Sequence, residues 1–191
     1  GKEPISIGFW VGGGVTPNTF EELKEDPEDP AKTRAARSKK NSIYKQLLTC
    51  PFCGKPLTEE NFYIDIPTKS VSVYCSDKMC MYYKYKPSNK MKIPVYLVDE
   101  EIYAECPTII LSTVDKFARL PWDVNTNALF GRVDRVCSRD GYVAIGADHS
   151  RHNRTEELPT STLTPIKSFL PPELIIQDEL HLITGPLGTI Y

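Results

Sequence analysis

The sequence lacks three patterns, and each absence excludes a class of protein. It has no run of about 18 apolar residues, so it predicts no membrane-spanning helix. Its first residues do not follow the basic, apolar, small-residue order of a secretory signal, so nothing indicates an oxidising compartment. It also has no G-x-x-x-x-G-K-[ST] phosphate-binding loop, so the chain as it stands is not expected to hydrolyse ATP efficiently.

The remaining composition is that of an ordinary soluble protein. The chain has 191 residues, of which 40% are hydrophobic and 25% charged, with a net charge of -2. That length is enough to bury a core. A net charge near zero neither supports nor excludes nucleic-acid binding, because the local distribution of charge matters more.

Several apolar segments predict an α/β fold with a parallel sheet. Residues 5–11 and 171–183 are apolar without alternation, which favours strands covered on both faces. Residues 107–120 predict a strand that breaks at Ser112 and Thr113 before a helix. Residues 93–98 predict a further strand and residues 133–145 a hairpin. In such sheets, functional side chains gather at the carboxyl ends of the strands.

Four of the six cysteines form two close pairs. Cys50 and Cys53 make a C-x2-C pair, and Cys75 and Cys80 make a C-x4-C pair. Between the pairs, the alternating β-rich runs FYIDI and SVSVYC predict a hairpin over residues 62–75. Two such pairs can surround a tetrahedral zinc ion with four thiolates. Disulfides would need an oxidising compartment, and four unligated thiols do not fit this spacing. We therefore expect a structural zinc that folds a ribbon too small for its own core.

The segment after the second pair, residues 78–92, carries five lysines around Tyr82, Tyr83 and Tyr85. The lysines could contact phosphates and the tyrosine rings could stack on bases, which would suit a nucleic-acid-binding surface. Tyrosines that pack on the ribbon, with lysines that keep it soluble, fit the pattern equally well.

The other two cysteines, Cys106 and Cys137, are expected to be inert buried thiols. Cys137 with His149 and His152 would offer three metal ligands, but their spacing matches no standard motif. The sequence leaves this second metal site open.

Two charge blocks follow each other near the start of the chain. Residues 21–30 carry six acids and one lysine, and residues 32–45 carry six basic residues and no acid. Such blocks are usually solvated linkers or helix faces, and the alternative is a patch that contacts phosphates. The sequence assigns no role to residues 20–45 or 121–170.

The apolar segment near the end of the chain leads into a D-E-x-H pattern made by Asp178, Glu179 and His181. In a nucleotide hydrolase, the first carboxylate at such a strand end holds Mg²⁺ and the second orients or activates the attacking water. The alternative is an acid pair that caps a helix N-terminus. The histidine favours the hydrolase.

Three segments, GFWVGGG, ILSTVDKF and IIQDELH, together resemble the first RecA-like domain of superfamily-two helicases, between the phosphate loop and the D-E-x-H box. The resemblance implies that a glycine turn and a T-P-G-R-L-like segment contact the nucleic-acid backbone. The matching positions are Gly12, Gly13, Thr113 and Lys116, whereas the family's proline and glycine are replaced here. It also implies that the box binds Mg²⁺, activates water and couples hydrolysis to strand movement, through Asp178, Glu179 and His181.

The segments WVGGGVTPNT, STVDKFARLPW and PPELIIQDELHLITGPLGT are closer still to the helicase-like branch of the DISARM bacterial anti-phage system. That likeness implies a longer, cytoplasmic bacterial protein with the phosphate loop upstream and a second RecA-like domain downstream. Its cofactors would be ATP and Mg²⁺, and its partners would be DNA of phage origin and other DISARM components. Residues 1–45 and 93–191 would form the partial RecA-like domain, and residues 46–92 an inserted four-cysteine ribbon.

The predicted function is therefore a fragment of an ATP-dependent DNA helicase or translocase, inactive alone. The lack of an initiator methionine fits a fragment. The alternative is a non-enzymatic zinc-ribbon module that binds nucleic acid or a partner protein, with the D-E-x-H pattern a coincidence.

Overall fold

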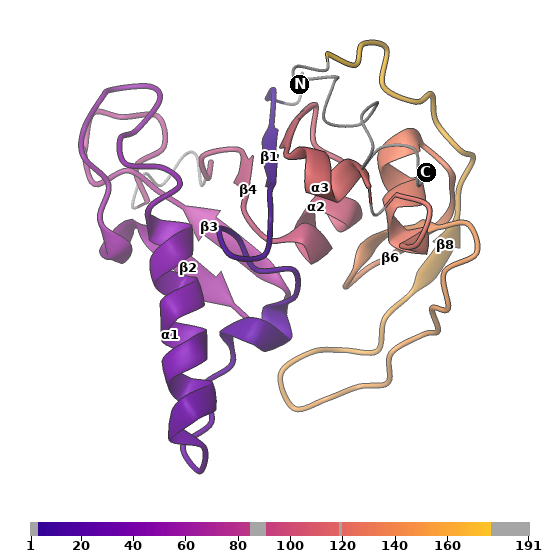
Figure 1. Ribbon diagram of the computed structural model, residues 1–191, viewed down its shortest axis with the longest axis horizontal. Helices are drawn as coiled ribbons and strands as arrows, with labels where there is room; N and C mark the ends of the chain where they lie inside the picture. The colour runs from indigo at the N-terminus through magenta and orange to yellow at the C-terminus, as the bar shows by residue number, and fades with distance from the viewer. Residues whose placement is uncertain (1–3, 85–90, 119, 177–191) are drawn as a thin grey trace, which may run out of the picture. The chain divides into compact units, whose positions relative to one another are not determined.

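The computed structural model describes residues 4–84, 91–118 and 120–176, which are drawn in colour in Figure 1. The chain divides into two units. The first is Gly1–Ile102 with Pro107–Leu111, and the second is Tyr103–Cys106 with Ser112–Tyr191. Within the described residues, no helix is long and apolar enough to cross a membrane.

The first unit contains a three-stranded sheet in the order β4-β1-β5. Its strands are β1 (Ile7–Trp10), β4 (Val95–Tyr96) and β5 (Ile109–Ser112), and β1 pairs with β4 in parallel. The α/β class with a parallel sheet is thereby confirmed. The sheet is only partly covered on its two faces, whereas the sequence favoured full cover. Burial alternates along β1, and Leu111 of β5 is 48% exposed.

Two helices precede the cysteine segment. The 3-10 helix η1 (Phe20–Leu23) buries both of its terminal side chains. The α-helix α1 (Pro30–Tyr44) begins after Asp29, whose side chain accepts hydrogen bonds from the Ala31 and Lys32 backbone N–H groups. Its first residue is a proline, which has no backbone N–H that would need a partner. Ala36 and Ile43 are the buried residues of α1, so the helix packs through its middle and its last turn.

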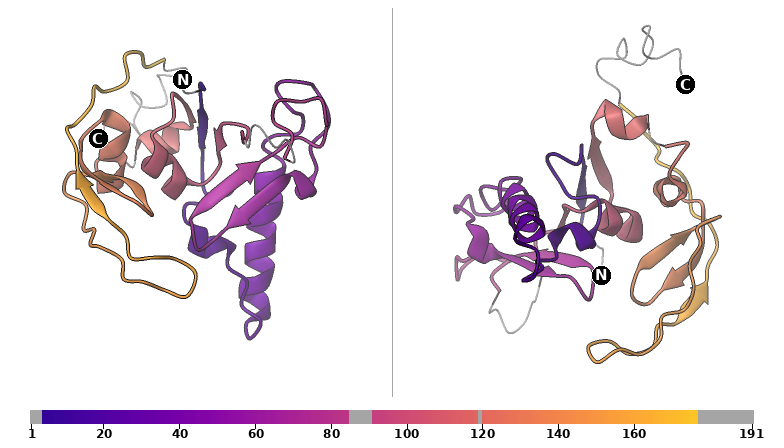
Figure 2. Two further views of the ribbon diagram at one scale, coloured as in Figure 1. Left: turned by 180° about the vertical axis from the view of Figure 1, so that it is seen from behind. Right: turned by 60° about the horizontal axis from the view of Figure 1, so that its bottom comes forward.

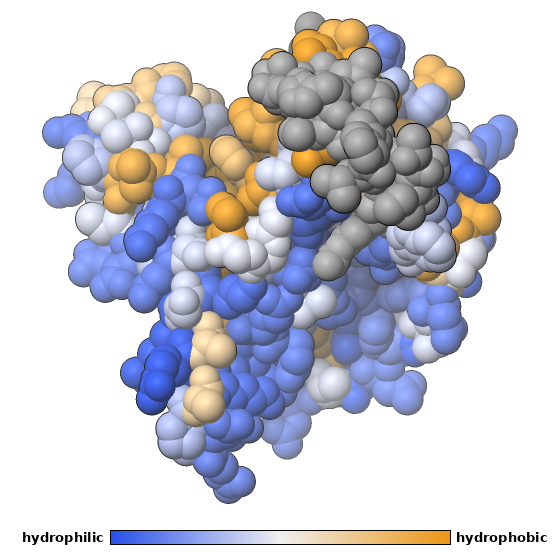
Figure 3. Space-filling model, in the orientation of Figure 1, coloured by the Kyte–Doolittle hydropathy of each residue, from blue (hydrophilic) through white to orange (hydrophobic). Residues whose placement is uncertain are grey.

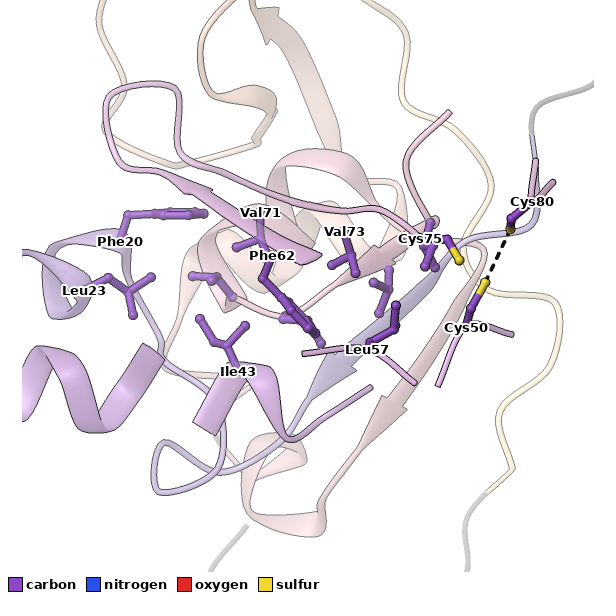
Figure 4. Close-up of a cluster of buried hydrophobic side chains, with 14 residues drawn as sticks. Phe20, Leu23, Ile43, Cys50, Leu57, Phe62, Val71, Val73, Cys75 and Cys80 are labelled. Atoms are coloured by element: carbon purple, nitrogen blue, oxygen red, sulfur yellow. Dashed lines mark hydrogen bonds between the residues drawn. The ribbon is translucent and has the colours of Figure 1, made fainter. Parts of the chain in front are cut away.

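The predicted hairpin is present as β2 (Phe62–Asp65) and β3 (Ser70–Val73), an antiparallel pair that follows the 3-10 helix η2 (Glu59–Asn61). Figure 4 shows Val71 and Val73 of β3 in one buried cluster with side chains of η1 and α1. Residues 46–92 therefore share their core with residues on both sides. Their status as an insertion between two parts of a RecA-like domain stays a prediction.

The helix α2 (Asp99–Glu105) fixes the hairpin through its acidic first turn. The buried Glu101 carboxylate accepts a hydrogen bond from the Val71 N–H of β3 at 3.1 Å. Glu100 accepts one from the Phe20 N–H at 2.9 Å and pairs with Lys69 at 2.9 Å. These contacts tie the hairpin and η1 to the same helix end.

The acidic and basic blocks neutralise each other across η1 and α1. Glu25 pairs with Arg37 at 3.0 Å and with Lys40 at 2.8 Å, and Glu22 pairs with Lys39 at 3.0 Å. Figure 3 shows the region of α1 as mainly hydrophilic. Because these cations already face carboxylates, the structure favours a solvated helix face over a phosphate-binding patch.

Glu22→Gln is expected to lower the free energy of unfolding by less than about 1 kcal/mol at neutral pH, since the pair with Lys39 lies near the surface. Burial alone would raise the pKa of Glu22, but hydrogen bonds from Lys39 and Asn18 outweigh it and hold the pKa below 4.5. A carboxyl with a lowered pKa adds stability above its unfolded pKa and loses it as the pH falls. Urea unfolding should therefore show that the difference in free energy of unfolding between the wild type and Glu22→Gln shrinks below pH 4.5. A difference that stays constant with pH would contradict this prediction.

The second unit is built on an antiparallel sheet in the order β7-β6-β8, seen from two more sides in Figure 2. Its strands are β6 (Val133–Cys137), β7 (Gly141–Ala144) and β8 (Leu163–Pro165). The helices α3 (Val114–Phe117) and η3 (Val124–Phe130) precede it. The predicted strand break before α3 and the predicted β6–β7 hairpin are confirmed, whereas β8 was not predicted.

The buried strand expected over residues 171–183 is not present in the part that the structure describes, which ends at Ile176. Leu174, Ile175 and Ile176 are 75%, 55% and 85% exposed. An apolar segment becomes a buried strand only against a sheet edge, and among the described strands none pairs with it. Residues 177–183 lie outside the described residues.

Gly131→Ala should destabilise the protein by about 2 kcal/mol or more relative to Gly146→Ala, as thermal or urea unfolding would measure. Gly131 ends η3 at φ 72°, and an added Cβ would collide with the Phe169 carbonyl. Gly146 has a comparable φ of 90°, but its nearest neighbour is a Val124 methyl at 3.3 Å. Equal effects of the two substitutions would show that the close approach of Phe169 is not required.

Candidate metal centre

The four paired cysteines meet at one end of the core of the first unit, where Figure 4 shows Cys50, Cys75 and Cys80. Their sulfur atoms all lie within 4.8 Å of one another, with 3.7 Å between Cys50 and Cys80 and 3.5 Å between Cys53 and Cys75. With zinc–sulfur bonds of about 2.3 Å, a regular tetrahedron has edges of about 3.8 Å. The arrangement can hold a metal ion such as zinc.

The sequence folds this way locally because each pair sits in a tight turn. Gly54 takes a left-handed φ of 72°, and its N–H bonds the Cys50 carbonyl at 2.9 Å. In the second pair, the Asp77 N–H faces the Cys75 sulfur at 3.3 Å and the Tyr82 N–H faces the Cys80 sulfur at 3.4 Å. All four cysteines are free thiols in this structure, so it gives the disulfide alternative no support.

The surroundings of this cluster shift the pKa values of three of its thiols. Burial raises the pKa of Cys75 to about 12 and also raises the pKa of Cys80. At the exposed edge, the Lys55 backbone N–H lowers the pKa of Cys53. Thiolates are the ligands that zinc needs, so metal binding at this cluster should release protons.

The lysine- and tyrosine-rich segment beside the cluster packs partly inward. Tyr82 packs against the core and lies edge to face with Phe52, and burial together with nearby Cys50 and Cys80 raises its pKa. The Lys84 ammonium lies 3.4 Å from the centre of the Tyr63 ring. These contacts favour packing over base stacking for the described part, whereas Tyr85 lies outside the described residues.

The predicted nucleic-acid contacts fall in different units. Gly12 and Gly13 belong to the first unit, in a turn after β1, and the Lys39 ammonium donates a hydrogen bond to the Gly13 carbonyl. Thr113 occupies the N-cap position of α3 in the second unit, with no side-chain hydrogen bond to the helix. Lys116 lies on that helix with only 4% of its surface exposed. Contact of these residues with a nucleic-acid backbone stays a prediction.

The predicted catalytic residues Asp178, Glu179 and His181 lie outside the described residues. Their roles rest on the sequence pattern alone.

The structure also brings Cys137, His149 and His152 together, the trio that the sequence left open. It adds Asp140, which sequence reasoning missed, from the turn between β6 and β7. A C-x2-D spacing before a glycine was the available signal, but it is too common to predict a ligand.

Comparison with known proteins supports the resemblance. No protein-family model matches the chain. Over 195 aligned residues, which include all of the chain, it is 46% identical to the DISARM protein DrmA of Bacillus paralicheniformis. The chain spans 16% of the length of that relative. The likeness to a protein of the DISARM system is thereby confirmed for this stretch.

Proposed function

We propose, from the likeness to DrmA along the whole chain, that this chain is part of an ATP-driven DNA helicase or translocase that acts in bacterial phage defence. The 46% identity is the observation that carries the proposal, since the alignment includes the whole chain. The proposal places the protein in the bacterial cytoplasm, with DNA and other DISARM components as its partners.

In this proposal the chain contributes the D-E-x-H box and the four-cysteine ribbon, and the phosphate loop comes from elsewhere in the protein. Asp178 would hold Mg²⁺ through water, Glu179 would orient the attacking water, and His181 would link hydrolysis to movement of the strand. Mg²⁺ neutralises charge on the ATP phosphates. Gly12 and Thr113 would contact the nucleic-acid backbone without reading its sequence.

We propose zinc as the metal of the four-cysteine cluster and a structural role for it. The sulfur separations of 3.5 and 3.7 Å suit a tetrahedral ion, and two backbone N–H groups face the sulfurs. Four protein ligands leave no open position for a substrate. The zinc would hold the two cysteine turns at the end of the core that the hairpin shares with α1.

Phage plating on a host that carries a complete DISARM locus tests the anti-phage role. Deletion of the gene for the full-length protein that contains this chain should restore plaque formation, and the intact gene supplied on a plasmid should suppress it again. If deletion leaves plating efficiency unchanged, the proposed role in defence is contradicted.

The alternative, a non-enzymatic binding module, gains support from two apolar side chains beside the cysteines. Phe52 is 61% exposed and Met79 is 87% exposed. Exposed apolar groups next to the cysteine turns suit docking on a partner protein. Partner binding that is insensitive to salt and lost in a Phe52→Ser, Met79→Ser variant, in a full-length protein without ATPase activity, would favour this alternative.

A further inference from the structure

A second group of ligand side chains lies in the second unit, where β6 turns into β7. Cys137 ends β6, Asp140 lies in the turn, and His149 and His152 come from the segment after β7. One ligand atom from each residue lies within 4.8 Å of those of the other three. We propose that these four residues bind a second zinc ion, independent of the four-cysteine cluster.

The Asp140 carboxylate is the centre of this group. Its Oδ2 atom lies 3.7 Å from the Cys137 sulfur and 3.7 Å from His149 Nε2, and it forms a hydrogen bond with His152 Nε2. One sulfur, one oxygen and two nitrogens form a donor set that zinc accepts in a tetrahedron. Since all four ligands come from the protein, the site is closed and structural rather than catalytic.

The backbone around Cys137 repeats the local geometry of the four-cysteine cluster. The Arg139 N–H, two residues further on, faces the Cys137 sulfur at 3.4 Å. The same relation joins Asp77 to Cys75 at 3.3 Å and Tyr82 to Cys80 at 3.4 Å. An N–H aimed at the sulfur is the kind of hydrogen bond that orients a ligand cysteine at a metal site. The turn therefore prepares Cys137 for ligation, which an inert buried thiol does not need.

A metal here also explains how a long irregular segment is held in place. Residues 145–162 contain no helix or strand, and loops of that length are uncommon unless they are functional or organised by other means. The segment is tied back near the proposed site: Arg139 donates a hydrogen bond to the Asn153 carbonyl at 2.9 Å, and the His152 N–H donates one to Ser161 at 2.7 Å. Zinc would further link residues 145–162, through His149 and His152, to Cys137 and Asp140 of the β6–β7 hairpin.

Zinc content of the full-length protein that contains this chain, purified without chelators, tests the proposal. His149→Ala should lose about one zinc per chain, Cys75→Ser should lose another, and the double variant should lose both. Asp148→Asn is the matched control, because Asp148 is exposed, adjoins His149 and lies outside the group. A His149→Ala protein that is folded by circular dichroism and keeps the wild-type zinc content overturns the proposal.

Cobalt substitution supplies a readout that does not depend on the folding of the His149→Ala variant. In a Cys75→Ser background, with the proposed second site intact, Co²⁺ should give the intense visible bands of tetrahedral coordination and a sulfur-to-metal charge-transfer band. Cys137→Ser in that background should remove the charge-transfer band. The proposal fails if the Cys75→Ser protein is folded by circular dichroism and shows no tetrahedral bands, or if Cys137→Ser leaves the charge-transfer band unchanged.

Discussion

Glu179→Gln is expected to reduce ATP turnover at least about 100-fold in the full-length protein that contains this chain, with nucleotide binding largely intact. The amide keeps the size of the side chain but cannot orient and deprotonate the attacking water as a carboxylate does. Asp178 would still hold Mg²⁺, so ATP should bind almost normally. Steady-state phosphate release and equilibrium nucleotide binding are the two measurements.

Glu173→Gln is the matched control for this prediction. Glu173 lies in the same segment, is exposed and does not belong to the D-E-x-H pattern, so its loss should leave turnover unchanged. Undiminished hydrolysis in Glu179→Gln would contradict the assignment of the box. Equal losses of ATP turnover in both variants would show that any change in this segment impairs the protein, and would not support a specific role for Glu179.

Cys75→Ser is expected to release zinc from the four-cysteine cluster and to destabilise the first unit by several kcal/mol. In small metallo-domains the free energy of zinc binding, about 10–16 kcal/mol, is also free energy of folding. Cys75 is 1% exposed and belongs to the same buried cluster as Val71 and Val73 of the hairpin. Loss of the metal should therefore loosen the hairpin as well as the cysteine turns.

The unfolding temperature and the zinc content test this prediction together. Cys106→Ala is the control, because Cys106 is a thiol outside both ligand groups whose pKa burial raises to about 12. It should keep its zinc. If Cys75→Ser retains the zinc content of the wild type, the cluster is not the metal site.

Local patterns carried the successful predictions. The four-cysteine cluster could be predicted because the two cysteines of each pair lie only a few residues apart in the sequence. The hairpin of residues 62–75 followed from alternation, and the break at Thr113 followed from a β-branched run that ends in polar residues. Each of these signals is contained in a few consecutive residues, so no tertiary information was needed.

Features set by tertiary contact were missed or mistaken. Residues 174–176 looked like a buried strand, but burial depends on a pairing partner that the sequence does not reveal. Asp140 joins the second ligand group only because the β6–β7 turn faces the following segment. The basic block was expected to be a solvated linker or helix face, which the structure supports, but only the fold shows that Glu25 faces Arg37.

X-ray absorption at the zinc edge tests most directly the claim that the four cysteines hold a zinc ion. The sample is the full-length protein with His149→Ala, which leaves the four-cysteine cluster intact and removes the proposed second site. The account predicts a first shell of four sulfurs at about 2.3 Å. A shell of nitrogen and oxygen, or the absence of zinc from this variant, would contradict it.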